Sequence, residues 1–500
     1  MAALHISLLV LVILFPLFLL FLVKKQTTRG LPPGPKGLPL IGNLLQLDNS
    51  NLPKHLWLLS KQYGPLMFLR LGSKPTLIVS SAKMAREVLK TQDLDFCSRP
   101  LLAGLQKLSY NGLDLAFAPY DDYWREMKKI CVIYLLNSNR VQSFRPIRED
   151  EVSRMLRNIS SLANDSKPVN LTEQMMALTS AAICRVAFGK RYEEGGSQAN
   201  RFHQLLNETQ ALFVGFFFSD YFPYFGWVVD KLSGMVSRLE KNFSEFDIFY
   251  QQLIDEHLDP NREKPEYENI LDVLLQIWND RSFKVQLSFD HIKAILMNVF
   301  VAGTDTSAAT VIWAMGFLMR NPEAMRKAQK EIRNTIGEKG FVNEDDVQQM
   351  PYLKAVVKET MRLQPTVPLL VPRETVQDCT LGGFHIPAKS LVHVNAWAIG
   401  RDPEVWEKPL EFYPDRFLNS NVDMKGQDYE LIPFGGGRRI CPGIFMGIAN
   451  VELSLANLLY KFDWEMPAGM KREDIDIDDV LPGIAVRKRD HLLLVAKIYI

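Results

Sequence analysis

One long apolar run marks the start of the chain. From Ile6 to Val23, about 18 residues, every position except Ser7 is apolar, which is long enough for a helix that spans a bilayer. No basic residue precedes the run, whereas Lys24 and Lys25 follow it, so the positive-inside rule places the body of the protein in the cytosol. We therefore predict a single-pass signal anchor over residues 1–23. A cleaved signal peptide, the alternative, would normally have a basic start, a shorter apolar run and a small-residue cleavage site.

Proline dominates the segment that follows the apolar run. Leu31-Pro32-Pro33-Gly34-Pro35 carries three prolines in four positions, which excludes a helix and favours a stiff, extended backbone. We predict a basic and proline-rich hinge over residues 24–39, either as a simple linker or as a spacer that fixes the attitude of a globular domain to the membrane. That domain would occupy residues 40–500.

Amphipathic helices account for most of the remaining pattern. Apolar residues recur at helical spacing along much of the domain, with β-like runs only at residues 66–71 and 76–80, within 371–394, and at the C-terminal end. The main predicted helices cover residues 81–91, 123–136, 149–162, 171–188, 236–258, 290–319, 322–336, 350–363 and 443–461. No second linker or repeat interrupts the pattern, so the fold class is mainly α, one large helical domain with a small β-rich portion.

Composition narrows the range of functions. The 500 residues carry 58 Lys and Arg against 57 Asp and Glu, a net charge of +1, which argues against a nucleic-acid binder held by bulk charge. The five cysteines are widely spaced and form no CxxC pair, so neither a disulfide framework nor a structural zinc or iron–sulfur site is expected. These features favour a catalytic domain that folds in a reducing compartment.

The strongest chemical signal is a glycine- and arginine-rich loop around one cysteine. The segment Pro433–Gly443 includes Phe434, Gly435, Arg439 and Cys441. Glycines let a backbone approach a flat partner, and arginines attract carboxylates. Pro442 suits the first position of the following helix, which would place Cys441 at its N-cap. A helix N-terminus and nearby arginines lower a thiol pKa, so we predict a thiolate that ligates haem iron, with a haem propionate paired to Arg439. The alternative is a glycine-rich turn with a buried cysteine.

A polar island interrupts the apolar helix predicted over residues 290–319. Small residues at Ala302 and Gly303 open one helix face to a bulky planar neighbour. Thr306 can bond back to a carbonyl one turn earlier and so bend the helix. Asp305 adds a carboxylate that can relay protons. Alone, this pattern fits an ordinary core helix equally well; beside Cys441 it predicts the distal wall of a haem site.

The cysteine loop resembles the ligand signature of cytochrome P450, the haem-thiolate monooxygenases, and the resemblance spans the chain. It implies the P450 fold, haem b (iron protoporphyrin IX) bound through Cys441, and dioxygen as the oxidant. In this family the pair that matches Asp305 and Thr306 delivers protons for cleavage of the O–O bond.

Other residues take family roles by the same resemblance. Glu359, Arg362 and Arg416 would form a buried ion-pair network behind the haem, although Asp415 stands where the family's Pro-Glu-Arg-Phe element usually has Glu. Three further residues would meet the haem propionates: Trp124, Lys128 in place of the usual Arg, and Arg373.

The resemblance also locates a substrate pocket. Its segments would lie near residues 101–117, 296–306, 367–370 and 481–484, and they are almost all apolar, so a small hydrophobic or aromatic substrate is expected. The aromatic-rich run of residues 212–229 fits protein core first, and a substrate roof or membrane contact second.

No GxGxxG motif opens a βαβ unit in this chain, so electrons must come from a partner. The resemblance implies an NADPH-dependent cytochrome P450 reductase and localisation in the endoplasmic reticulum membrane. Lys128, Lys129 and Arg438 are candidates for the docking face.

Short segments, including residues 91–94, 219–225 and 395–398, are similar to plant microsomal members of specialised metabolism, nearest to the group that metabolises aldoximes in glucosinolate formation. The leading hypothesis is a membrane-anchored monooxygenase that oxidises a hydrophobic plant metabolite. A haem-thiolate isomerase or dehydratase, and a non-enzymatic haem-binding scaffold, are the alternatives.

Overall fold

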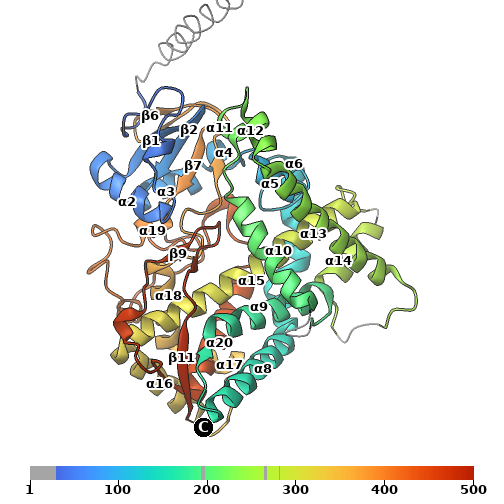
Figure 1. Cartoon of the computed structure of the whole chain (residues 1–500), viewed down its shortest axis with the longest axis vertical. Coiled ribbons are helices and arrows are strands. Elements are labelled where there is room, and N and C mark those ends of the chain that lie inside the picture. Colours follow the sequence, from blue (N-terminus) through green and yellow to red (C-terminus); the bar gives the residue numbers. More distant parts are fainter. Residues whose placement is uncertain (1–29, 193–196, 264–266, 281, 500) are drawn as a thin grey trace, which may run out of the picture.

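The computed structural model describes residues 30–192, 197–263, 267–280 and 282–499, so the predicted anchor over residues 1–23 and the basic start of the hinge lie outside the described residues. The described chain is mainly helical with small sheets, as predicted (Figure 1). Residues 30–36 are hydrogen-bonded to the body: Phe68 N donates to Pro33 O at 2.9 Å, and His385 N donates to Gly30 O at 2.7 Å.

The largest sheet has four strands in the order β1-β2-β7-β4. Strands β1 (Leu66–Leu71) and β2 (Lys74–Val79) form an antiparallel hairpin, and β7 (Leu391–Val394) runs parallel to β2 with Thr76 opposite Leu391. The other strands are β3 (Val169–Asn170), β4 (Arg373–Glu374), β5 (Cys379–Leu381), β6 (Phe384–Ile386), β8 (Phe462–Glu465), β9 (Val480–Leu481), β10 (Arg487–Lys488) and β11 (Leu493–Ile498). Strands β1, β2, β6 and β7 lie at one end of the molecule, and β11 lies among the helices toward the C-terminus. Apolar side chains of β1, β2 and β7 bury one face of this sheet against residues 85–96.

Nine long helices build the described helical region. They are α8 (Arg145–Asn164), α9 (Leu171–Phe188), α10 (Ser197–Phe213), α13 (Met235–Leu258), α14 (Ile270–Asn279), α15 (Phe289–Arg320), α16 (Pro322–Ile336), α18 (Pro351–Leu363) and α20 (Ile444–Lys461). The other α-helices are α2 (Leu52–Tyr63), α3 (Ala82–Arg86), α4 (Asp93–Phe96), α5 (Ala103–Leu108), α6 (Asp122–Ile130), α7 (Ser138–Ser143), α11 (Phe218–Tyr221), α12 (Gly226–Leu232), α17 (Glu344–Val347) and α19 (Ala396–Ile399).

Helix α15 runs through the middle of the molecule (Figure 1). It begins after a Ser288–His291 capping box and ends at Asn321, before Pro322 opens α16, in agreement with the N-cap and proline rules. Its apolar side chains pack into one core with α8, α9, α16, α18 and α20, and into a second core with α9, α13 and α14. Among the described residues α15 is the helix long and apolar enough to cross a membrane, but 72% of its most apolar stretch is buried inside the protein, as expected for a core helix.

Candidate functional site

A largely apolar cavity of about 330 Å³ lies between the middle of α15 and the loop that carries Cys441, within the size range of small-ligand sites. Segments far apart in sequence line it: residues 115–117, the start of α20, and parts of α6, α9, α10 and α15. The predicted site residues on its wall are Trp124, Lys128, Thr306, Arg373, Phe434, Gly435, Arg439 and Cys441. The structure thus brings eight of the predicted residues to one cavity.

Cys441 lies in a tight turn ahead of α20. Its backbone N–H donates to Phe434 O at 3.0 Å. Helix α20 begins at Ile444 with Gly443 as its N-cap, so the prediction that Cys441 is the N-cap and Pro442 the first helical residue is wrong by two positions. Burial raises the pKa of the Cys441 thiol to about 11, although the Gly443 N–H partly opposes this. The arginines do not lower this pKa as predicted, because their side chains bind backbone carbonyls instead. A bound metal ion itself deprotonates a coordinating thiol.

Two of the three glycines before Cys441 are needed for different reasons. Gly435 has a φ of 71° and lines the cavity, and a Cβ there would meet only Leu370 at 3.8 Å. Gly437 has a φ of 67° and packs so closely that a Cβ would lie 1.8 Å from Leu89 O. Gly435 therefore keeps the cavity wall open to a flat ligand, whereas Gly437 is needed for packing against the chain before α4.

Arginines on one side of the cavity are held by backbone carbonyls. Arg439 donates to Cys97 O at 2.9 Å and to Ala118 O at 2.7 Å. Arg373 donates to Gly436 O at 3.2 Å and pairs with Asp93 at 3.1 Å.

Arg99, which sequence analysis missed, belongs to the same group of arginines. It donates to Ala116 O at 2.8 Å and to the carbonyls of Val371 and Pro372, each at 2.7 Å. All three guanidinium groups line the cavity and are buried or nearly so.

These arginines concentrate positive charge in a dry site. Burial, reinforced by Arg373, lowers the pKa of Arg439 to about 9, and burial together with Arg439 and Arg373 lowers the pKa of Arg99. The buried carboxylates nearby belong to Asp93 and Asp114, and burial raises the pKa of Asp114 to about 6, which weakens its negative charge. Because cations repel one another in a low-dielectric site, the arrangement favours an anionic ligand. A thiol, an open wall and an arginine cluster fit haem with its carboxylates.

Trp124 and Lys128 reach the cavity with their polar atoms already bound. The Trp124 indole N–H donates to Leu115 O at 3.0 Å, and Lys128 Nζ donates to Arg438 O at 2.5 Å. The Arg439 guanidinium lies 4.0 Å from the centre of the Trp124 ring, a cation–π distance. In this structure both residues therefore support the arginine side of the cavity.

The opposite wall is the middle of α15. Ala302, Gly303 and Thr306 line the cavity there. Thr306 Oγ1 donates to Ala302 O at 2.7 Å, the predicted bond to the preceding turn. A Cβ on Gly303 would lie 2.4 Å from Ile183 Cδ1, so glycine at this position permits the close contact between α15 and α9.

Asp305 does not line the cavity. Its carboxylate is fully buried, accepts a hydrogen bond from Gln210 Nε2 of α10 at 2.8 Å, and lies 3.5 Å from Arg487 of β10. Burial raises the pKa of Asp305, and Arg487 opposes that rise. Sequence analysis identified neither partner, since each comes from a distant segment.

The predicted ion-pair network is present beside the cavity. Glu359 pairs with Arg362 at 2.7 Å and with Arg416 at 3.1 Å. Arg362 also donates to the carbonyls of Pro409 and Glu411 at 2.7 and 2.9 Å. The network therefore fixes the segment after α19 against α18.

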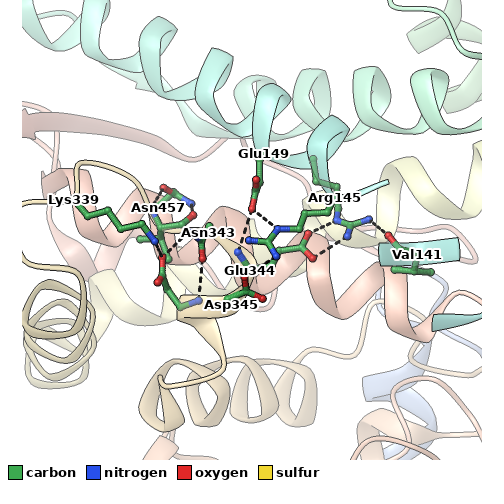
Figure 2. Close-up of polar contacts among 11 residues, drawn as sticks. Val141, Arg145, Glu149, Lys339, Asn343, Glu344, Asp345 and Asn457 are labelled. Atoms are coloured by element: carbon green, nitrogen blue, oxygen red, sulfur yellow. Dashed lines mark hydrogen bonds and ion pairs between the residues drawn. The ribbon is translucent and has the colours of Figure 1, made fainter. Parts of the chain in front are cut away.

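A further buried ion pair, which was not predicted, joins α8 to Glu344 of α17, and Figure 2 labels Glu344 among its neighbours. Arg148 of α8 contacts both carboxylate oxygens of Glu344 at 2.5 and 2.9 Å. It also donates to Val141 O at 2.9 Å and contacts Met446 Sδ at 3.3 Å. Since Met446 is in the first turn of α20 and lines the cavity, this pair ties α8 and α17 to the helix that follows Cys441.

The substrate side agrees with the predicted segments, with one correction. Residues 115–117, parts of the segments 299–306 and 367–371, and residues 484–485 contribute to the cavity wall. The aromatic run of residues 212–229 is core only in part: Leu212 and Phe217 are buried in a small apolar cluster, whereas Tyr224 is 92% and Trp227 60% exposed. The core expectation therefore holds for the first part of the run, and the exposed aromatic side chains of its second part lie between α11 and α12 and on α12.

Comparison with known proteins gives a consistent result. The family model for Cytochrome P450 matches residues 32–495. The chain is 53% identical to 6,7,8-trihydroxycoumarin synthase and 52% identical to 5-OH-xanthotoxin synthase, both of Pastinaca sativa, over 98% of each chain. A solved zebra fish cytochrome P450 with progesterone superimposes with a TM-score of 0.76 at 26% identity, covering 89% of this chain and all of the other. Family match, whole-length relatives and fold agree with the geometry of the cavity, and the chain therefore belongs to the cytochrome P450 family of monooxygenases.

Proposed function

We propose that this protein hydroxylates a planar, aromatic plant metabolite of the coumarin type. The observation that carries the proposal is the cavity itself, in which Cys441 and the arginine cluster face an apolar wall that ends at Thr306. Relatives that share about half of the sequence over nearly its full length are named for coumarins and furanocoumarins, and a flat aromatic lactone suits such a wall.

Within this cavity Cys441 would ligate the haem iron, and Arg99, Arg373 and Arg439 would hold its carboxylates. When bound, haem supplies the oxidising power that inserts one atom of dioxygen into the substrate. The protein would orient the substrate with apolar side chains such as Phe117 and Phe213, and these also exclude water.

Proton delivery is assigned to Asp305 and Thr306. Thr306 Oγ1 is on the cavity wall, whereas the Asp305 carboxylate is turned toward Arg487, whose side chain is 20% exposed. Arg487 connects the carboxylate to the protein surface, and burial favours the protonated acid. Asp305 would thus collect a proton near the surface side of α15, and Thr306 would present one to the cavity.

We base the proposed substrate class on the relatives that match over nearly the whole chain, and not on the similarity of short segments. Similarity to aldoxime-metabolising enzymes rests on a few stretches such as residues 219–225, so an aldoxime is kept as a comparison substrate. The Asp305–Thr306 pair favours dioxygen chemistry over an isomerase, a dehydratase or a scaffold.

We also propose attachment to the endoplasmic reticulum membrane through residues 1–23, with the catalytic domain in the cytosol. Exposed apolar side chains between α11 and α12 and on α12, including Tyr224 and Trp227, support membrane contact. Ser73 N donates to Tyr221 O at 2.8 Å, so this surface adjoins the β1–β2 turn at the end of the molecule where residue 30 lies (Figure 1). Electrons would come from an NADPH-dependent reductase docked near Lys129 and Arg438.

The test uses the full chain in microsomes with a plant reductase and NADPH. The ferrous–carbon monoxide difference spectrum should show the strongly red-shifted band of a thiolate-ligated haem, and Cys441→Ser should lose it. Coumarins, furanocoumarins and indole aldoximes are then incubated under isotopically labelled dioxygen. Labelled hydroxycoumarin supports the proposal. A product from an aldoxime alone, or a product without label, contradicts it.

A further inference from the structure

One buried polar side chain on the described cavity wall has a hydrogen-bond acceptor without a partner. Gln210 of α10 is 4% exposed and lines the cavity. Its Nε2 donates to Asp305 Oδ2 at 2.8 Å. Within the part of the chain that the structure describes, its Oε1 has no hydrogen-bond partner. A buried acceptor without a partner is unfavourable, so this oxygen is suited to a ligand.

The amide orientation follows from its neighbour. Arg487 lies 3.5 Å from Asp305 Oδ1, and the guanidinium favours the ionised form of that carboxylate. In the structure the NH₂ group of Gln210 faces Asp305 and donates to its Oδ2 at 2.8 Å. The carbonyl oxygen of the amide is thereby left as an acceptor at the cavity wall.

Two other polar side chains on this side of the cavity already make hydrogen bonds. Thr306 Oγ1 donates to Ala302 O. Asn298 Oδ1 accepts from the backbone N–H groups of Leu115 and Ala116, and Asn298 Nδ2 donates to Asp114. The surfaces around Gln210 come mainly from apolar side chains such as Ile183, Phe213 and Val301. Gln210 Oε1 is therefore a buried acceptor without a partner in a largely apolar wall.

We propose that Gln210 is a specificity-determining residue, whose Oε1 accepts a hydrogen bond from a hydroxyl group on an otherwise apolar, aromatic substrate. This inference rests on the function proposed above and narrows its substrate class to phenols. A site with a buried acceptor discriminates strongly against an analogue that lacks the donor, whereas an apolar pocket barely distinguishes the two.

The experiment compares two ligands that differ by one hydroxyl. Umbelliferone, a hydroxycoumarin, and coumarin are titrated into the purified holoenzyme, and dissociation constants are measured by calorimetry and by the haem absorbance shift. The wild-type protein should bind umbelliferone about tenfold more tightly. Gln210→Met, which keeps side-chain length but removes the acceptor, should reduce this preference to within about twofold. Gln210→Asn, which withdraws the acceptor by one methylene, should do the same and serves if Gln210→Met does not fold.

Thr209→Val is the matched control. Thr209 precedes Gln210 on α10 and is buried, but it bonds to Leu205 O and Asn242 rather than facing the cavity. This variant should keep the wild-type preference. Equal binding of the two coumarins by the wild-type protein, or a preference that survives in both Gln210 variants, overturns the inference.

Turnover separates this inference from the proposed function. Oxidation of coumarins without a hydroxyl preference would uphold the function and overturn the role of Gln210. A Gln210-dependent preference without oxidation of either coumarin would uphold the role of Gln210 and overturn the proposed function. If neither coumarin binds, the same ratio is measured with naphthol and naphthalene, and its loss in Gln210→Met decides the role of Gln210.

Discussion

Backbone carbonyls, rather than side-chain anions, fix most of the guanidinium contacts around the cavity. Arg439 is held by Cys97 O and Ala118 O, and Arg99 by the carbonyls of residues 116, 371 and 372. Neutral acceptors orient an arginine without cancelling its charge. The positive charge is therefore retained for a ligand, which makes these residues binding groups as well as structural ones.

Replacing Thr306 tests its role at the cavity wall. Thr306→Ala removes the hydroxyl and its bond to Ala302 O, so proton delivery should no longer be coupled to electron delivery. We expect product formed per NADPH to fall roughly tenfold, with hydrogen peroxide accounting for the lost electrons. The control is Thr304→Val: Thr304 makes the same kind of bond, to Phe300 O, but is buried away from the cavity. An unchanged ratio of product to NADPH in Thr306→Ala would rule out the proposed role.

Glu452 on α20 gives a prediction on stability. Burial raises its pKa from 4.5 to about 7, partly opposed by Lys354 and Lys358. Between these pH values the folded protein holds a proton that the unfolded chain releases, so stability falls as pH rises through this window, by about 3 kcal/mol in all. Glu452→Gln should raise the melting temperature above pH 7 and leave it unchanged below pH 4.5. The exposed Glu473→Gln should have no effect at either pH; equal shifts at both pH values for Glu452→Gln would contradict the assignment.

At the scale of single elements, sequence spacing alone does not decide which ion pairs form. Glu359 and Arg362 pair at 2.7 Å, yet Arg154, at the same spacing from Glu151, pairs with Asp150 instead. Likewise Glu323, which has Arg326 three residues later, pairs with Lys327. The pair on α18 differs because the chain after α19 covers it and removes both side chains from water.

Arg362 should not tolerate replacement by lysine. Its guanidinium spans Glu359 and the carbonyls of Pro409 and Glu411, and an ammonium group cannot reach all of these acceptors at once. We expect Arg362→Lys to lower the free energy of unfolding by about 3 kcal/mol and to yield mostly haem-free protein. Retention of the thiolate-type carbon monoxide band at wild-type level would contradict this. Arg326→Lys, on the exposed face of α16, is the control.

Elements could be predicted well where the chain carries explicit start and stop signals. Helices over residues 171–188 and 322–336 match α9 and α16 to the residue, because Asn170 caps the first, Gly189 ends it, and Pro322 opens the second. Helices α2, α10 and α14 were not predicted, although Asn51 and Gly64 bound α2 and an Asn269–Asp272 capping box opens α14. In the site, Cys441 and Thr306 stand in recognisable motifs. Arg99 and Gln210 do not, because only tertiary contacts distinguish a buried arginine or glutamine from an exposed one.

On the scale of the whole molecule, charge on the surface near Cys441 should govern electron delivery. Lys129 is exposed on α6, next to Lys128, which bonds to Arg438 O. Lys129→Glu should reduce reductase-supported turnover about fivefold at low ionic strength, and high salt should abolish the difference from wild type.

Turnover driven by a chemical peroxide needs no reductase and should be unaffected by Lys129→Glu. Lys241→Glu, at an exposed position of α13, is the matched control. A salt-independent defect in Lys129→Glu would point to damaged structure in place of a docking role.

The close packing of α15 on α9 also bears on how such enzymes diversify. A Cβ at position 303 would lie 2.4 Å from Ile183 Cδ1, so a side chain there requires Ile183 to move. New selectivity must then arise from the loops around residues 115–117, 367–371 and 484–485 and from α10, which border the cavity without carrying Cys441 or Thr306. Gene duplication followed by change in these segments can thus yield enzymes for new metabolites while the oxygen chemistry is inherited intact, and laboratory evolution should direct its libraries to the same positions.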